Sequence, residues 1–337
     1  MQGDAPRARQ ASIRLLKATH TPGRHCASTA LADLVNFRGI EWSEARCFGI
    51  GCGLGIWYFR GEGKSPERLV HVRSADIEEQ FFRRIGQSFR WRRRDDPLES
   101  ERDLIAALDG GDPAIVQSDI CHLPYYNTTT HFPGHVIAVW GYDMEKQVFF
   151  VTDTEREKLV EVPFEAMRKA RYVQMGFFDI RGNMYAPHGI IAPDNIPEIM
   201  RSSIIDQSRR LLDGSQDYQG IAALRKWRSE LGGWKGFKDR QWTARFTYQV
   251  IERRGTGGGG FRLMYADFLD EAASALPNAA RLGLPSLMRE AASAWSGLAM
   301  ALKELSERTD FDPGAAGEAL ERVMLAESEY HRAAISL

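Results

Sequence analysis

The sequence predicts an α+β domain followed by a mostly α-helical domain. In the first half, short runs with strand-period alternation of apolar residues lie between helices with one apolar face. A stretch rich in proline and glycine follows, and beyond it apolar residues recur at helical spacing almost throughout. The chain length of 337 residues also favours two domains. We therefore expect a first domain at 1–182, a linker at 183–197 and a helical domain at 198–337.

The composition excludes several classes of protein. A hydrophobic fraction of 43% with 26% charged residues is typical of a globular chain, and a net charge of −1 gives no argument for a nucleic-acid or anionic-membrane partner. The chain contains no apolar run long enough for a membrane span. The first twenty residues lack the apolar core of a signal peptide and are expected to form a mobile arm or a short strand. Four cysteines are too few for a disulfide framework, which favours a reducing cytoplasm.

The segment Thr21–Leu34 carries the first chemical signal. A loop that ends at His25 runs directly into Cys26, where helical spacing of apolar residues begins. The first turn of a helix has unpaired N–H groups and the positive end of the dipole, which together lower a thiol pKa. The alternative is that Cys26 is a small buried side chain without reactivity.

The remaining elements of the first domain follow from local patterns. We expect helices at 42–47, 77–85, 97–108 and 163–169, and strands at 69–73, 113–117, 135–142, 147–152, 159–162 and 173–180. The glycine-rich run Phe48–Gly63 lacks the spacing of both a dinucleotide fingerprint and a phosphate-binding loop. It therefore favours close backbone packing beside a cleft over phosphate binding.

The predicted hairpin at 135–152 carries the second chemical signal. His135 begins one strand and Asp153 follows the end of the next. In an antiparallel pair these two positions lie at the same edge of the sheet, within reach of each other.

Together the residues give the chain order Cys26, His135, Asp153, which is the order in papain-like cysteine enzymes. In such a site the thiolate attacks an acyl carbonyl, the imidazole moves the proton, and the carboxylate fixes the imidazole tautomer. Cys121 with His122, His131 and His135 suggests a metal site as the competing interpretation. Zinc prefers tighter ligand spacing than this, so we predict no metal.

The helical domain is predicted to contain six helices, at 198–212, 218–231, 239–253, 265–276, 287–308 and 313–336. Its Gly-rich loop lies between Arg254 and Arg262 and is either an anion site at a helix start or a flexible turn. A separate arginine cluster at Arg83–Arg94 is either a solvated face or a dock for an acidic partner.

Several of these motifs, taken together, resemble one known family. They are His25-Cys26-x-Ser28, the glycine run before Trp57-Tyr58, Asp119 with Leu123-Pro124-Tyr125, Gly134-His135, and Val151-x-Asp153. They resemble the N-terminal domain of the butirosin-biosynthesis protein H family. The helical remainder, above all Ile251-Glu252-Arg253 and GTGGGGFR, resembles the uncharacterised domain that usually follows it.

The resemblance implies a papain-like acyltransferase of natural-product biosynthesis. Such an enzyme takes an aminoacyl group from the phosphopantetheine thioester of an acyl or peptidyl carrier protein and places it on an amine, without a cofactor of its own. By resemblance Cys26 is the nucleophile, His135 the base and Asp153 the orienting carboxylate.

The same resemblance implies the binding residues. Asp119, Tyr125 and Tyr126 would line the acyl or amine site. From charge alone, the Arg83–Arg94 cluster and the arginines around the glycine loop, Arg262 among them, are candidates to meet the acidic carrier protein and its phosphate. Unlike papain, the chain has no glutamine before the cysteine at the spacing that supplies an oxyanion donor. The backbone N–H of Cys26 is then one donor, and the second is unassigned.

Two alternatives stay open at this point. A thioesterase, amidase or peptidase would use the same three residues with water as the acceptor. A non-catalytic binding protein would retain them as a relict. The sequence does not identify the acyl group, the amine or the oligomeric state.

Overall fold

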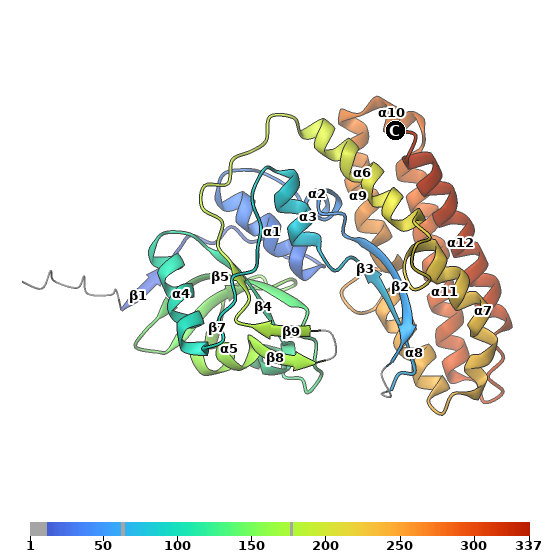
Figure 1. Cartoon of the computed structure of the whole chain (residues 1–337), viewed down its shortest axis with the longest axis horizontal. Coiled ribbons are helices and arrows are strands. Elements are labelled where there is room, and N and C mark those ends of the chain that lie inside the picture. The colour runs from blue at the N-terminus through green and yellow to red at the C-terminus, as the bar shows by residue number, and fades with distance from the viewer. Residues whose placement is uncertain (1–11, 62–64, 176–177) are drawn as a thin grey trace, which may run out of the picture. The chain divides into compact units, whose positions relative to one another are not determined.

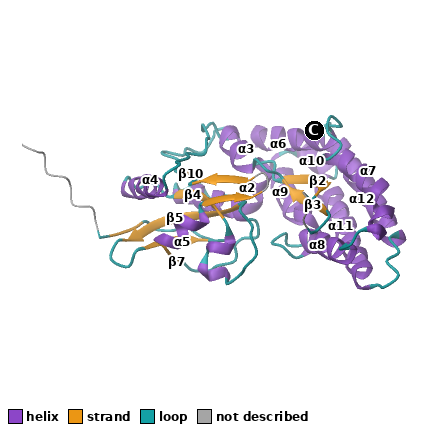
Figure 2. Ribbon diagram, turned by 60° about the horizontal axis from the view of Figure 1, so that its bottom comes forward, coloured by secondary structure: helices purple, strands orange, loops and turns teal. Residues whose placement is uncertain are grey.

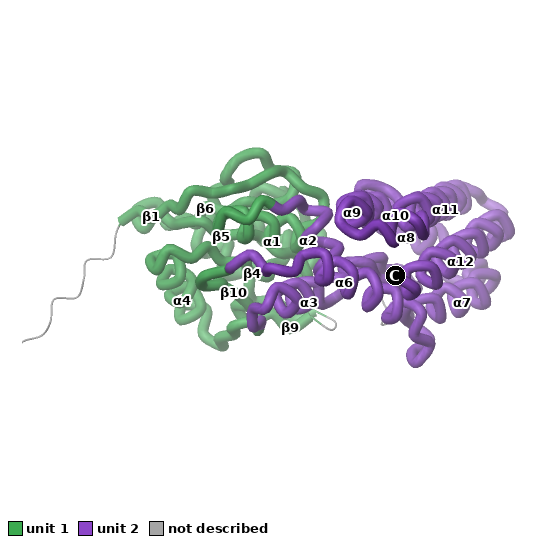
Figure 3. Tube along the Cα trace, turned by 90° about the horizontal axis from the view of Figure 1, so that it is seen from above, with its two compact units in different colours: residues 1–41, 90–190 green, residues 42–89, 191–337 purple. Residues whose placement is uncertain are grey.

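The computed structural model describes residues 12–61, 65–175 and 178–337, which divide into two compact units. Unit 1 contains the described parts of Met1–Glu41 and Arg90–Ile190, and unit 2 contains those of Trp42–Phe89 and Ile191–Leu337 (Figure 3). Figure 1 labels most of their helices and strands.

Unit 1 is built on an antiparallel sheet in the order β10-β4-β5-β6-β7, with β1 also paired to β5. The strands are β1 (Ile13–Leu15), β4 (Ala114–Ser118), β5 (His135–Asp143), β6 (Val148–Thr152), β7 (Val160–Pro163) and β10 (Met184–Tyr185). β4 pairs with the first half of β5 and β1 with its last three residues. Gly141 permits the approach of β1, because a Cβ there would lie 2.2 Å from the Arg14 carbonyl oxygen.

Helices cover both faces of β5. They are α1 (Cys26–Phe37), α4 (Pro97–Asp109) and α5 (Phe164–Ala170), with 3₁₀ turns η1 (Ile120–His122) and η2 (Pro124–Tyr126). Ile137 and Val139 pack in one apolar core with Leu104 of α4 and Met167 of α5. Trp140 faces the opposite way and meets α1, its ring 5.6 Å from that of Phe37. As a result every residue of β5 is buried. Figure 2 draws β4, β5 and β7 among the strands, in orange, and α4 and α5 among the helices, in purple.

Unit 2 is mainly helical. Its helices are α2 (Glu44–Ile50), α3 (Ile77–Arg84), α6 (Ile196–Leu212), α7 (Gly220–Glu230), α8 (Arg240–Glu252), α9 (Arg262–Ala275), α10 (Pro277–Arg281), α11 (Leu284–Glu307) and α12 (Gly314–Ala334). Two 3₁₀ turns, η3 (Leu231–Gly236) and η4 (Gly259–Phe261), and a hairpin of β2 (Leu54–Arg60) and β3 (Arg68–Arg73) complete it. The long helix α11 packs on α8, α9 and α12. None of the described helices is both long and apolar enough to cross a membrane.

The predicted mixture of helices with an antiparallel sheet, followed by a helical region, is confirmed, whereas the papain-like fold stays a prediction. One strand differs: the region 173–180 contains β8 (Tyr172–Met175) and β9 (Phe178–Arg181), which pair with each other.

The boundary between the units also differs from the predicted one. Residues 42–89 group with unit 2, because the β2–β3 hairpin packs on α7 and α8 and α2 packs on α9. Tyr58 of β2 stacks on Trp227 of α7, with ring centroids 5.8 Å apart. At the expected linker, Met184–Tyr185 pairs with β4, so the chain stays in unit 1 until Ile190.

Candidate active site

Cys26 is the first residue of α1, because His25 caps that helix. His25 has extended backbone angles, and its Nδ1 accepts a hydrogen bond from the Ser28 N–H at 3.2 Å. The Thr29 hydroxyl donates to the His25 carbonyl at 2.9 Å. Cys26 is buried, with 6% of its surface exposed, and the first turn contains no acidic residue to oppose a thiolate.

Two sets of hydrogen bonds hold the start of α1 near the end of β6. The Gly23 N–H, in the loop before Cys26, donates to the Thr154 carbonyl at 2.9 Å. The Thr152 hydroxyl donates to the Asp33 carboxylate of α1 at 2.7 Å and accepts from the Trp140 indole at 2.8 Å. The helix that carries the thiol is therefore tied to the strand that leads to Asp153.

His135 and Asp153 form a buried pair. His135 is the first residue of β5, and Asp153 directly follows β6, its antiparallel neighbour. The Nε2–H of His135 donates to the Asp153 carboxylate, with Nε2 at 2.9 and 2.8 Å from its two oxygens. Both residues are at most 5% exposed. The two ends predicted to share a sheet edge do lie within hydrogen-bonding distance.

The Cys26 sulfur also affects the pKa of this pair. Burial by itself would lower the pKa of His135, but the Asp153 carboxylate and the Cys26 sulfur together raise it above its ordinary value. Cys26 contributes through its charge and through a hydrogen bond to the imidazole. Burial opposes the Asp153 carboxylate too, yet His135 keeps the pKa of that group below its usual range. Because Nε2 is hydrogen-bonded to Asp153, Nδ1 is the ring nitrogen that can form a hydrogen bond with the thiol.

Tyr125 and Tyr126 bond to the pair. The Tyr125 hydroxyl donates to Asp153 Oδ2 at 2.6 Å, and the Tyr126 hydroxyl lies 3.2 Å from His135 Nε2. Burial and then the Asp153 charge raise the pKa of both phenols, which keeps them protonated. The Arg156 guanidinium covers both rings, at 5.4 and 5.7 Å from their centroids. The resemblance places these tyrosines in a substrate site, which stays a prediction, and in the structure their hydroxyls contact the His135–Asp153 pair.

Asp119 lies at the start of η1 and is fully buried. Its carboxylate accepts hydrogen bonds from the N–H groups of Cys121 and Phe132, at 3.2 and 2.7 Å, and lies 2.6 Å from His131 Nδ1. These contacts make Asp119 an organising residue of the 119–132 segment.

Arg262 does not occupy the binding position that the sequence suggested. It lies in unit 2 with no exposed surface, and its Nε donates to the Glu327 carboxylate at 2.7 Å. Its Nη1 donates to the carbonyls of Val72 and Gly260. Because these buried partners occupy the guanidinium, Arg262 stabilises unit 2.

The Gly-rich loop before Arg262 behaves as a turn. The N–H of Gly259 donates to the Glu252 carboxylate at 3.0 Å, and that of Gly258 donates to the Thr256 hydroxyl at 3.2 Å. The chain's own carboxylate thus takes the position that an anionic ligand would need.

The arginine cluster divides between the two units, with Arg83 and Arg84 in unit 2 and the others in unit 1. Arg84 pairs with Asp206 at 3.0 Å. Arg92 and Arg94 both pair with Asp103, at 3.6 and 2.7 Å. Arg90 and Arg93 are exposed.

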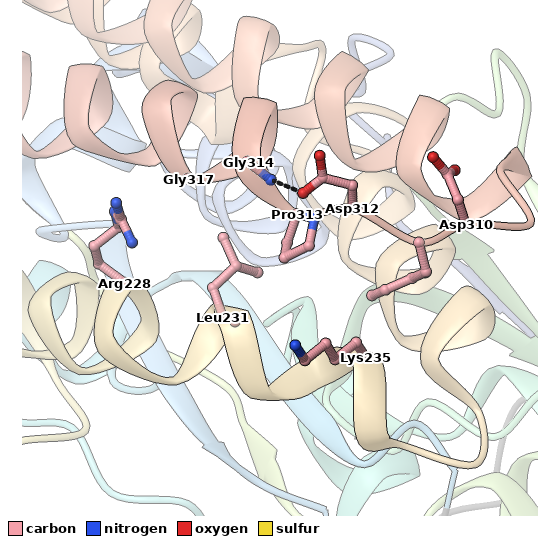
Figure 4. A pocket seen from close by; sticks show the side chains of 10 residues that line it. Arg228, Leu231, Lys235, Asp310, Asp312, Pro313, Gly314 and Gly317 are labelled. Carbon is pink, nitrogen blue, oxygen red and sulfur yellow. Dashed lines mark hydrogen bonds between the residues drawn. The ribbon is translucent and has the colours of Figure 1, made fainter.

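A pocket of about 450 Å³ lies in unit 2 (Figure 4). Its charged lining residues are of both signs: Arg228, Lys235, Asp310 and Asp312. Asp312 accepts a hydrogen bond from the Gly314 N–H at 3.1 Å, and Arg228 pairs with Glu321. The lining holds no cysteine, serine or histidine, so this pocket offers no thiol, hydroxyl or imidazole for acyl transfer.

Sequence reasoning did not predict the structural roles of two residues near the site. His25 caps the helix of Cys26, and histidine is uncommon as a cap, so only its place before the helical run pointed to it. Arg156 covers the tyrosines from a turn, where no periodic pattern exists to reveal it.

Comparison with known families supplies the context for this geometry. The profile described as "Butirosin biosynthesis protein H, N-terminal" matches residues 25–154, and "Domain of unknown function (DUF4872)" matches residues 165–334. The chain belongs to the butirosin biosynthesis protein H-like family. The resemblance drawn from the sequence motifs is thereby confirmed.

In this butirosin biosynthesis protein H-like chain, the N-terminal match begins one residue before Cys26 and ends one residue after Asp153. It therefore encloses the cysteine, the histidine and the aspartate. A search of curated proteins finds no match to the chain.

Proposed function

We propose that the protein is a cysteine-dependent acyltransferase with a papain-like site. It moves an acyl or aminoacyl group from the phosphopantetheine thioester of a carrier protein to an amine. The observation that carries this proposal is the buried His135–Asp153 pair at 2.8 Å, with Cys26 at the start of α1 beside the imidazole. The family match, named for a biosynthesis protein, supports a place in natural-product assembly.

In the first half-reaction the Cys26 thiolate attacks the thioester carbonyl carbon. The raised pKa of His135 favours the imidazolium, which both stabilises the thiolate and holds a proton. As the tetrahedral intermediate collapses, the bond to the pantetheine sulfur breaks and that sulfur takes the proton from His135. The first-turn dipole of α1 and the Cys26 N–H are the proposed stabilisers of the oxyanion.

In the second half-reaction an amine attacks the acyl carbon on Cys26. His135, now neutral, accepts the proton that the amine loses, and the Cys26 thiolate leaves as the amide forms. Asp153, whose carboxylate accepts a hydrogen bond from Tyr125, holds Nε2 throughout, so that Nδ1 exchanges the proton. Because an amide is more stable than a thioester, the transfer needs neither ATP nor a metal.

Intact mass spectrometry with short acyl thioesters tests the proposal. We expect the protein to gain one acyl group, located on Cys26 by peptide mapping, and to lose it as an amide when an amine is added. The Cys26→Ser variant should gain none under the same conditions. The proposal is wrong if the wild type gains no group or if the variant gains as much.

The runner-up function is hydrolysis, with water in place of the amine. It is supported by the same three side chains, since the residues described so far do not select the acceptor. An acyl-enzyme that yields only the free acid, even with a large excess of varied amines, would favour the hydrolase. A relict site without chemistry would give no acyl-enzyme at all.

The carrier protein would present acidic residues and a phosphate, and the exposed Arg90 and Arg93 of unit 1 suit such a partner. Replacing Arg93 by Glu leaves the pairs of Arg92 and Arg94 with Asp103 intact. We expect this change to raise KM for the carrier-bound donor while kcat stays the same. Arg209→Glu, an exposed site in unit 2, is the matched control. An unchanged KM in Arg93→Glu would show that the carrier protein does not dock at this surface.

A further inference from the structure

Three side chains of one segment in unit 1 converge outside the cysteine site. Asp119, His122 and His131 each offer one ligand atom, and these atoms lie within 4.8 Å of one another. We propose that this cluster binds a divalent transition metal, with Zn²⁺ the best fit, and that the metal clamps the 119–131 segment. The inference stands independently of acyl transfer.

Asp119 has the geometry of a pre-organised ligand. Its side chain is completely buried, and Oδ1 is held by the backbone N–H groups of Phe132 at 2.7 Å and Cys121 at 3.2 Å. Oδ2 is directed at His131 Nδ1, 2.6 Å away. One oxygen therefore fixes the carboxylate while the other faces the histidine side of the cluster. Asp119 brings a negative charge that a bound cation would offset.

The two histidines lie where they can complete the set. His122 ends η1 and its ring centroid is 5.9 Å from that of His131. Two ligands of a tetrahedral zinc lie about 3.3 Å apart, given bond lengths of about 2.0–2.1 Å. His131 must then move outward from Asp119 by less than about 1 Å. Its side chain is 42% exposed, so this movement displaces no core packing.

The donor set selects the metal. Two imidazoles and one carboxylate suit zinc and its first-row neighbours, whereas magnesium and calcium prefer sets made of oxygen alone. Three protein ligands leave a fourth position for water or a solute.

A metal at this position would act on the segment that supports His135. In sequence the ligands flank η2, whose Tyr125 hydroxyl donates to Asp153 and whose Tyr126 hydroxyl lies 3.2 Å from His135 Nε2. Phe132, whose N–H donates to Asp119, has its ring 6.4 Å from the His135 ring. The metal would thus restrain both tyrosines by closing the loop that carries them.

The chain contains a matched control. His188 pairs with Asp112 through Nδ1 at 2.9 Å, which reproduces half of the cluster without the second histidine. His188 is 86% exposed, so its replacement should not disturb the fold.

The test is a zinc titration of the full-length protein, stripped with a chelator, against a competing chromophoric chelator. It is performed in a Cys26→Ser background, because a thiol beside an imidazole also binds zinc. We expect one equivalent to bind and the thermal unfolding midpoint to rise with zinc but not with magnesium. His131→Gln, at a half-exposed side chain, should weaken binding by about 10-fold or more, and His188→Gln should not.

Equal zinc affinity in the parent and in His131→Gln would overturn the proposal. The proposal would also be overturned if His188→Gln weakened zinc binding as much as His131→Gln does. Because acyl transfer is not measured, failure here leaves the proposed function intact, and failure of the acyl-enzyme experiment leaves the metal site intact.

Discussion

Each unit contains a buried histidine–carboxylate pair of almost the same length, and unit 1 contains a further one, His20 with Asp33 at 2.8 Å. Here the His135 pair is compared with the pair in unit 2. In unit 1, His135 Nε2 lies 2.8 Å from Asp153, and in unit 2, His331 Nε2 lies 2.9 Å from Glu327. All four side chains are at most 6% exposed. Geometry and burial of the pair alone do not distinguish a reactive site from a structural one.

The third partner distinguishes them. Glu327 also accepts from Arg262 Nε at 2.7 Å and from the Trp295 indole at 2.6 Å, which joins α9, α11 and α12. Burial opposes its charge, but Arg262 and His331 hold the pKa of Glu327 well below its usual range. In unit 1 the third partner is the thiol of Cys26, the proposed nucleophile. The first arrangement joins helices, and the second is the one that we propose activates a sulfur.

The largest effect should come from the thiol itself. Cys26→Ser is expected to lower acyl transfer by about 10³-fold or more, since a hydroxyl is a far weaker nucleophile near neutral pH. Its free energy of unfolding should stay close to that of the wild type. Steady-state kinetics and urea unfolding measure the two quantities. Full activity in the serine variant would remove Cys26 from the mechanism.

Breaking the unit 2 pair should act on stability instead. Glu327→Ala leaves Arg262 buried without its partner, and such a loss typically costs about 3–5 kcal/mol. Glu321→Ala is the control on the same helix, because it breaks only an exposed pair with Arg228 worth about 0–1 kcal/mol. Urea unfolding of both variants gives the comparison. Equal losses of unfolding free energy in the two variants would show that the buried network stabilises the protein no more than an exposed ion pair does.

Neutral replacements sharpen the contrast between the pairs. Asp153→Asn should lower turnover by about 10²-fold or more, because an amide no longer holds the imidazolium. Glu327→Gln should leave the turnover of the folded protein unchanged while it lowers the unfolding midpoint. A fall in turnover in Glu327→Gln that matches Asp153→Asn would mean that the two pairs do not have separate roles.

Tyr125→Phe should have a smaller effect. It removes a hydrogen bond to a charged carboxylate, worth about 1.5–3 kcal/mol, and leaves the packing of the ring. We expect turnover to fall by about 10-fold and Asp153 to titrate at higher pH. The acid limb of the pH–rate profile reports the second change. An unshifted acid limb would show that the tyrosine does not act through Asp153.

The pH dependence of stability should be the smallest effect. His135 has a raised pKa in the folded state, so its contribution is complete below the unfolded value of 6.5 and is lost as pH rises through the folded pKa. Asp153 has a lowered pKa, so its contribution is present above the unfolded value of 3.8 and is lost in acid. The stability advantage of the wild type over His135→Gln should therefore shrink as pH rises above 6.5. An advantage that grows with pH would contradict the assignment.

Local patterns predicted where Cys26, His135 and Asp153 lie in the fold, because each of them lies at the end of an element. A helical run that begins at Cys26 and a hairpin bounded by His135 and Asp153 need only short-range information. The hydroxyls of Tyr125 and Tyr126 were placed in a substrate site by resemblance, since no pattern shows which way a 3₁₀ turn directs its side chains.

The features that the sequence did not predict depend on contacts between residues far apart in the chain. In the sequence, Arg262 is a cation beside a glycine loop, which suggests an anion site. Its charge is neutralised by Glu327, which lies on another helix far along the chain, so no local pattern reveals the pair. In the same way, residues 42–89 carry strand and helix patterns that fit the first domain, and only their contacts with α7, α8 and α9 assign them to unit 2.

The account rests on a Cys26 sulfur kept ionised by His135, and alkylation measures this most directly. At about pH 6 an ordinary thiol is less than about 1% ionised, so Cys26 should react with iodoacetamide about 10²-fold faster than Cys121 in the same molecule. Cys121 is the more exposed of the two, so access alone predicts the opposite order. His135→Gln should abolish the advantage. If Cys26 reacts no faster than Cys121, or equally fast without His135, the sulfur is not held as a thiolate and the account is contradicted.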